Sequence, residues 1–190
     1  MHARGEAKPE ELRSGVRRMV EALTDVPAIA VGRRADILAW NPLAHALIAP
    51  HWPYEPSGRR PNFARLDFLE PDFARRLYPD WEAKARDDIA YLQVSVGKFP
   101  GDEGLMALIG ELRELSGEFR RMWAEHPVSN CASVSRVYRH PEVGDMELTT
   151  ELLRTPDDEG QAVTLFQAPA GSVSQERLGR LAELVSTTAG

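Results

Sequence analysis

The stretch from Asp145 to Arg154 alternates between two kinds of side chain with a period of two residues. One set is Met146, Leu148, Thr150 and Leu152, and the other is Glu147, Thr149 and Glu151. This alternation predicts a strand of an antiparallel sheet with one face on a core and the other toward solvent. The C-terminal half of the chain must therefore supply partner strands and a layer that covers the apolar face.

Partner strands are predicted on both sides of this stretch and again near the N-terminus. Residues 130–141 and 161–169 form a meander with it, and the sequence PDDEG at 156–160 is typical of the turn between the last two strands. Residues 28–31 and 37–40 are short apolar runs that flank a turn, so they predict a hairpin. The chain is thus predicted to form five antiparallel strands.

Helices are predicted before, between and after the strands. Apolar residues at helical spacing mark 10–24, 42–48, most of 63–99, 102–126 and 174–185, with Ser172 or Ser174 as the last cap. Asn41 and Pro42 suit a helix cap and a first helical residue, and Ser116-Gly117 is predicted to divide 102–126 into two helices. We therefore predict an α+β fold in which the sheet carries helices on one face, preceded by an N-terminal connector helix.

Composition limits the class of protein. The chain has 190 residues, of which 43% are hydrophobic and 27% charged, and its net charge is −6. Such an acidic domain is not expected to bind DNA by itself. One cysteine, Cys131, allows no intrachain disulfide, and neither a signal peptide nor an apolar run of membrane-spanning length occurs. We expect a cytoplasmic protein that does not enter the membrane.

Catalytic and metal-binding motifs are absent from the sequence. It contains no nucleotide-binding glycine pattern, no HExxH and no GxSxG. His126 and His140 could approach Glu142 or Asp145, but their spacing does not indicate a metal site. We expect no metal, no cofactor, no catalytic residue and no enzyme activity. Asp87-Asp88 is predicted to lie on a solvated helix face, and Asp157-Asp158 in a turn.

Large apolar side chains are the remaining candidates for function. They are typical of a filled core, and an alternative is that they line an elongated cavity between helices and sheet. Arginine would suit an acidic ligand head because it forms charge-assisted, bidentate hydrogen bonds. The predicted ligand-binding residues are Trp40, Asn41, Phe63, Arg65, Phe68, Trp81, Phe119, Arg120, Trp123 and His126. Asn62 is a further polar candidate.

An ordered set of segments resembles a known family. PEELRSGVRRMVEAL, PAIAVGRRADILAWNPLAHAL, NFARLDFLEPDFARRLYPDWEAKARDDIAYL, ELSGEFRRMWAEHPV and HPEVGDMELTTELLRTPDDEGQAVTLFQAPAGS follow one another over residues 9–185. Together they resemble the C-terminal ligand-binding domain of MmyB-like transcription regulators.

The resemblance implies a PAS-like fold and a sensor role. It implies a disordered N-terminus at 1–9, a connector and dimerisation helix at 10–24 and a PAS-like ligand-binding domain at 25–187. The implied ligand is a fatty acid or similar small amphiphile, and the implied assembly is a homodimer. Regulators of this kind resemble XRE-type proteins, which bind DNA through a helix-turn-helix that we expect to be missing from this chain.

Two other functions remain open from the sequence. The domain could be a dimerisation module with a filled core, which predicts an exposed apolar face on residues 12–23. It could also be an enzyme acting on a small apolar substrate, with His126 and a nearby carboxylate as the catalytic pair.

Overall fold

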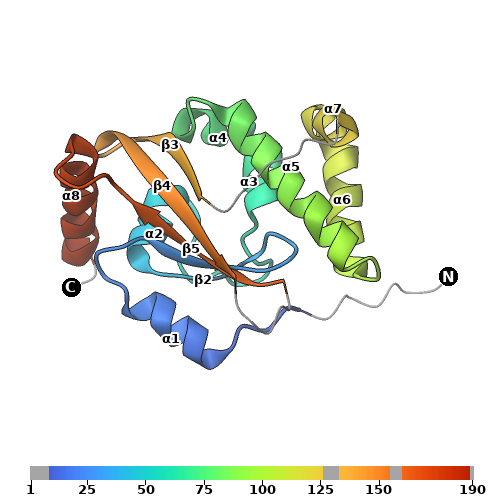
Figure 1. Ribbon diagram of the computed structural model, residues 1–190, viewed down its shortest axis with the longest axis horizontal. Coiled ribbons are helices and arrows are strands. Elements are labelled where there is room, and N and C mark those ends of the chain that lie inside the picture. Colours follow the sequence, from blue (N-terminus) through green and yellow to red (C-terminus); the bar gives the residue numbers. More distant parts are fainter. Residues whose placement is uncertain (1–8, 126–132, 155–159, 189–190) are drawn as a thin grey trace.

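A five-stranded antiparallel sheet forms the centre of the molecule (Figure 1). The computed structural model describes residues 9–125, 133–154 and 160–188. The strands are β1 (Ala28–Val31), β2 (Ile37–Trp40), β3 (Ser133–His140), β4 (Gly144–Arg154) and β5 (Ala162–Gln167). Their order is β2-β1-β5-β4-β3, so the N-terminal hairpin joins the C-terminal meander where β1 pairs with β5. The predicted α+β class is confirmed, and the predicted PAS-like arrangement is consistent with this sheet.

The described residues include eight helices. They are α1 (Ser14–Ala22), α2 (Pro42–Ile48), α3 (Phe63–Leu69), α4 (Pro71–Leu77), α5 (Trp81–Lys98), α6 (Glu103–Leu115), α7 (Gly117–Glu125) and α8 (Val173–Thr188). Several predicted boundaries are confirmed by side-chain caps. The Asn41 side chain accepts a hydrogen bond from the Ala44 amide at 2.8 Å, and the Ser116 hydroxyl accepts one from the Phe119 amide at 3.1 Å. Of the two serines considered for α8, Ser172 is the cap, because its hydroxyl accepts from the Gln175 amide.

The two faces of the sheet are covered by different helices. Alternate residues of β1 belong to separate cores: Ile29 and Val31 pack with α2 to α8, whereas Ala28 and Ala30 pack with α1. Figure 1 shows α1 below the sheet and α5 to the right of it, with α6 and α7 beyond α5. Because β1 is buried on both faces, its sequence is a continuous apolar run and does not alternate.

The first helix begins later than predicted. It starts at Ser14, because Glu10 is buried and caps the β1–β2 turn, so it takes no part in a helical first turn. Its carboxylate accepts hydrogen bonds from the amides of Arg33 and Arg34 at 3.1 and 3.4 Å. A Cβ atom on Gly32 would lie 2.4 Å from that carboxylate, so this approach requires glycine.

Candidate functional site

A cavity of about 110 Å³ lies between α5 and the sheet. Its walls come from β1, β3, β4, β5 and α5, with single residues from α2 and α3 and from the segment before α5. The lining residues are Val31, Ala35, Ile48, Phe63, Tyr78, Lys84, Asp87, Asp88, Tyr91, Val134, Arg136, Tyr138, Thr150, Leu152, Thr164 and Phe166. Most of the wall is apolar, and the charged members come from α5 and β3.

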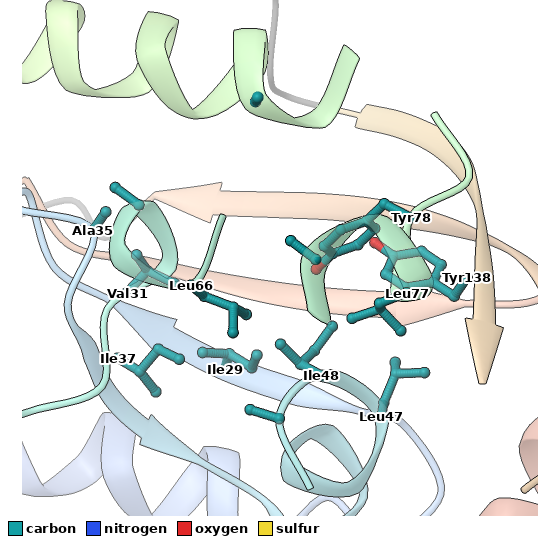
Figure 2. Packing of buried hydrophobic residues seen from close by; sticks show 14 of the residues in the cluster. Ile29, Val31, Ala35, Ile37, Leu47, Ile48, Leu66, Leu77, Tyr78 and Tyr138 are labelled. Atoms are coloured by element: carbon teal, nitrogen blue, oxygen red, sulfur yellow. The ribbon is translucent and has the colours of Figure 1, made fainter. Parts of the chain in front are cut away.

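Figure 2 shows how part of this wall is built from the core. Val31 and Ala35 lie at one end of the displayed cluster and Tyr78 and Tyr138 at the other, with Ile48 between them. The two tyrosine rings meet edge to face, with centroids 5.4 Å apart. The cavity wall therefore combines Val31 and Ala35 with the Tyr91 hydroxyl beside the β1–β2 turn, and it has two further tyrosines beside β3.

Lys84 is the centre of a buried charge cluster on the α5 side. Its Nζ atom donates to Asp67 Oδ2 at 2.5 Å and to both Oδ atoms of Asp88 at 2.6 Å. The Asp67 side chain is completely buried, and the other two side chains are 12% and 15% exposed. Three bonds to carboxylates use the three donors of the ammonium group, so Lys84 is saturated.

The charges in this cluster shift one another's proton affinity. Burial lowers the pKa of Lys84, but the attraction of Asp67 and Asp88 outweighs burial and raises it above its ordinary value. Burial raises the pKa of Asp88 well above its ordinary value. The attraction of Lys84 lowers this pKa, whereas the negative charge of Asp67 raises it further. Lys84 therefore stays charged, and Asp88 gives up its proton less readily than an ordinary aspartate.

Arg136 brings a second cation to the cavity from the sheet. Its Nη2 atom donates to Asp87 Oδ2 at 2.5 Å, which joins β3 to α5 across the cavity. The Arg136 side chain is only 12% exposed. Of the five N–H groups of a guanidinium, this bond uses one.

The two aspartates of α5 correct one prediction from the sequence. We predicted that Asp87-Asp88 lies on a solvated helix face, and this is wrong, because both residues line the cavity and pair with buried cations.

Lys84, Asp87, Asp88 and Tyr91 are spaced at i, i+3, i+4 and i+7, and all four line the cavity. This polar stripe beside the apolar one was the sequence signal for the site. The signal for Arg136 was its alternation with Val134 and Tyr138 on β3.

The structure places the predicted ligand-binding residues in several regions. Phe63 lines the cavity. Four of the predicted aromatic residues instead pack together between helices: Phe68, Trp81, Phe119 and Trp123. The Phe68 and Phe119 rings are 5.0 Å apart, and the Trp81 indole donates to the Asp67 carbonyl. These contacts place the four aromatic residues in a core between helices, outside the cavity wall.

The two predicted arginine anchors have structural partners elsewhere. Arg65 pairs with Glu111 at 2.8 Å, and Arg120 donates to the carbonyls of Arg113 and Glu114 at the end of α6. Neither arginine lines the cavity. The arginine at the cavity is Arg136, which we did not predict from the sequence.

Trp40 and Asn41 lie at the end of β2. The Trp40 indole donates to the Tyr54 carbonyl at 3.0 Å and packs against His45. Asn41 is fully buried and makes four hydrogen bonds to the backbone of Leu23, Val26, Ala28 and Ala44. Asn62 caps α3 through the Arg65 amide. Their bonds are structural, and ligand binding by the predicted residues stays a prediction.

Histidine and the carboxylates near it do not gather into a metal site in the described part of the chain. His140 is buried and bonded to the Ala46 carbonyl and the Glu142 amide, which links β3 to α2. His126, Cys131 and Asp157-Asp158 lie outside the described residues. No described helix is both long enough and apolar enough to cross a membrane.

One family matches the chain over most of its length. The family is described as the MmyB-like transcription regulator ligand binding domain, and its model matches residues 12–181. The matched region contains the sheet, the cavity and α1 to α7 in full, and it ends within α8. No curated protein matches the chain.

Proposed function

Because the chain belongs to the family of MmyB-like transcription regulator ligand binding domains, we propose that it senses a small amphiphile that binds in the cavity between α5 and the sheet. The observation that carries this proposal is the composition of the cavity wall, which is mostly apolar and includes charged side chains from α5 and β3. Such a wall suits a ligand with an apolar body and a polar head. A fatty acid is the ligand class that we propose.

The size of the cavity limits how such a ligand binds. Pockets for drug-sized ligands span roughly 300–1,000 Å³, whereas this cavity has about 110 Å³. A long-chain acid would therefore need the walls to separate. Since α5 meets β3 through Asp87 and Arg136, a shift of α5 from the sheet would widen the cavity and change that contact.

The proposed output is a change in DNA binding by a transcription regulator. Family membership supports a regulatory role rather than a catalytic one. We propose that DNA is bound through a separate helix-turn-helix of XRE type and that the protein works in the cytoplasm.

A homodimer is also proposed, but not through the apolar stripe of α1. Leu12, Val16, Val20 and Leu23 pack on the sheet of the same chain and are not an exposed apolar face. The interface would therefore lie on another surface. Light scattering on wild type and on a chain shortened by residues 1–24 tests the role of this helix.

The ligand proposal is tested by what the purified protein carries and binds. Native mass spectrometry and solvent extraction should reveal a bound amphiphile, and straight-chain acids of increasing length should raise the melting temperature. Val134→Phe, which fills the cavity wall, should abolish this increase, whereas Val137→Phe, on the outer face of the same strand, should leave it unchanged. A clean extract together with no thermal response to any acid would refute the proposal.

A further inference from the structure

The turn between β1 and β2 meets the cavity on one side and the segment before α1 on the other. Val31 before the turn and Ala35 within it line the cavity, and Figure 2 shows both at one end of the core cluster. Ala35 has a φ of 61°, in the left-handed region that residues with a side chain rarely adopt. Such a conformation persists only while its surroundings hold it, so the shape of the turn depends on what lies against it.

Tyr91 of α5 contacts the turn from the cavity side. It lines the cavity, and its hydroxyl lies 3.0 Å from the Gly32 carbonyl oxygen and 3.5 Å from the Gly160 carbonyl oxygen. A ligand larger than the cavity of about 110 Å³ requires α5 to move away from the sheet. Because Tyr91 belongs to α5, this movement would withdraw its hydroxyl from both carbonyls.

Glu10 holds the segment before α1 against the outer side of the turn. The residue is buried, and its carboxylate accepts hydrogen bonds from the amides of Arg33 and Arg34. Its carbonyl accepts a further hydrogen bond from Arg60 Nη1 at 2.9 Å. The carboxylate lies so close to Gly32 that a Cβ atom on this glycine would overlap it. A change in the shape of the turn would therefore displace the Glu10 side chain.

A second contact holds the same segment. The side-chain amide of Gln161 donates to the Glu11 carbonyl at 2.9 Å. Gln161 directly follows Gly160, whose carbonyl lies beside the Tyr91 hydroxyl. Each carbonyl near that hydroxyl is thus next in sequence to a donor that holds the segment before α1.

We propose that the β1–β2 turn couples the cavity to the segment before α1: a ligand that moves α5 withdraws Tyr91, the turn relaxes, and Glu10 is released. Coupling between two sites requires an element whose arrangement both sites bias. The turn is in contact with Tyr91 on the cavity side and with Glu10 on the outer side. This inference rests on the proposed function and describes how occupancy of that site is transmitted to residues 9–13, which lead into α1.

Hydrogen exchange measured by NMR tests the release directly. The amides of Arg33 and Arg34 donate to Glu10, so their exchange reports whether it is in place. Saturating dodecanoate should raise their exchange rates about 5-fold or more, a factor within the ordinary range of coupling between sites. The amides of α8 serve as the internal reference. A ligand that only rigidifies the protein would slow the exchange of Arg33 and Arg34.

The reciprocity of binding free energies gives a second test. If the ligand releases Glu10, then releasing Glu10 must strengthen ligand binding by the same factor. Glu10→Ala removes the carboxylate and Gly32→Ala displaces it, and neither residue lines the cavity. Both variants should bind dodecanoate roughly 5-fold more tightly in calorimetry. If Glu10 only stabilises the fold, both variants bind as wild type does or more weakly.

Matched controls lie close to these two positions in the sequence. Glu11→Ala replaces an exposed glutamate next to Glu10 and keeps the backbone carbonyl that Gln161 contacts. Gly15→Ala adds a Cβ atom where no listed neighbour would lie within 4 Å. Both variants should bind dodecanoate with the affinity of wild type.

The link from α5 to the turn is tested without ligand. Tyr91→Phe removes the hydroxyl that bonds the turn, so it should raise the exchange rates of the Arg33 and Arg34 amides about 2- to 10-fold in the ligand-free protein. Tyr54→Phe is the control, because it removes a hydroxyl bonded to the Trp40 carbonyl outside the cavity. It should leave these exchange rates unchanged.

The outcomes separate this inference from the proposed function. If dodecanoate binds while the exchange of Arg33 and Arg34 is unchanged or slower, the coupling is overturned and a ligand sensor remains. The coupling is also overturned if Glu10→Ala and Gly32→Ala gain no affinity, or if Tyr91→Phe leaves the exchange unchanged. If no straight-chain acid binds and the solvent extract is empty, both proposals fail.

Discussion

The two faces of the sheet are packed by different means. The face under α1 is closed by a small core in which every buried member is apolar: Val20, Ala28, Ala30, Leu38, Ala39 and Val163. The face under α2 to α8 has the larger core, yet it includes a cavity and the buried charges of Lys84, Asp67 and Asp88. Replacing a buried ion pair with apolar residues is often neutral or stabilising, so stability alone does not explain the charges. One face is therefore closed by apolar packing, whereas the other keeps a cavity and buried charges.

Loss of Lys84 should have the largest effect. Lys84→Met leaves Asp67 and Asp88 buried without their cation, which costs about 3–5 kcal/mol for a broken buried pair. Arg86→Met on the same helix removes surface pairs with Glu82 and Glu125 and should cost much less, because exposed pairs contribute little. Urea unfolding monitored by circular dichroism measures both. Equal losses in the two variants would mean that the charged cluster contributes no more than a surface pair.

Asn41 ties the two faces together, and its loss should rank second. Its side chain bonds Leu23 and Val26 after α1, Ala28 in β1 and Ala44 in α2. Asn41→Ala removes a cap worth about 1 kcal/mol and leaves buried backbone groups unsatisfied, so the total loss should be roughly 3 kcal/mol. Asn41→Asp keeps the acceptor but turns an oxygen, in place of the amide donor, toward the Leu23 and Val26 carbonyls at the same buried position, so it should be at least as destabilising as alanine. An aspartate variant as stable as wild type would show that the two bonds donated by the amide contribute nothing.

The apolar face is tested at Val20, the completely buried residue of α1. Val20→Ala removes two methyl groups and should reduce the free energy of unfolding by about 2 kcal/mol. Its neighbour Met19 is 49% exposed, so Met19→Ala should change stability by less than about 0.5 kcal/mol. Thermal unfolding gives both values. A Val20→Ala variant as stable as wild type would show that α1 is only loosely docked.

The smallest effect is expected at Glu10 and depends on pH. Burial raises the pKa of Glu10 above its ordinary value of 4.5, although the amides of Arg33 and Arg34 and the charge of Arg33 oppose it. The folded state then binds the proton more tightly than the unfolded state, so this group's contribution to stability falls as pH rises through the folded pKa. Glu10→Gln cannot titrate, so its stability relative to wild type should be higher at about pH 7 than at about pH 4.

The control for this comparison is the unfolding free energy at several pH values between those limits. A constant difference between Glu10→Gln and wild type would show that the carboxyl titrates normally. If the stability of Glu10→Gln relative to wild type fell toward higher pH, the pKa of Glu10 would be lowered in the folded state and not raised.

Local patterns predicted the fold better than they predicted the site. Alternation in β4, the Asn41-Pro42 cap and the Ser116-Gly117 break are short-range signals, and each is confirmed. The start of α1 was predicted too early because Glu10 is held by amides of the β1–β2 turn, a contact across more than twenty positions that no local pattern reveals.

The site depends on contacts between distant segments. Aspartates and a lysine on a helix are usually solvated, and only packing against β3 turns those of α5 inward. Similarly, Arg65 and Arg136 are not distinguishable by residue type, and their roles follow from what each one faces: Glu111 in one case and the cavity in the other. The sequence predicted a cavity between helices and sheet. The polar stripe on α5 also indicates part of its wall, but the prediction did not use it.

The saturation of Lys84 also determines its chemical reactivity. Acylating reagents attack the neutral amine, and the raised pKa together with three bonds to carboxylates keeps that form scarce at Lys84. Lys98 lies exposed at the end of the same helix, so such reagents should modify it before Lys84. Modification of Lys84 then requires its bonds to Asp67 and Asp88 to break, so the rate of its labelling measures how often this charge cluster opens.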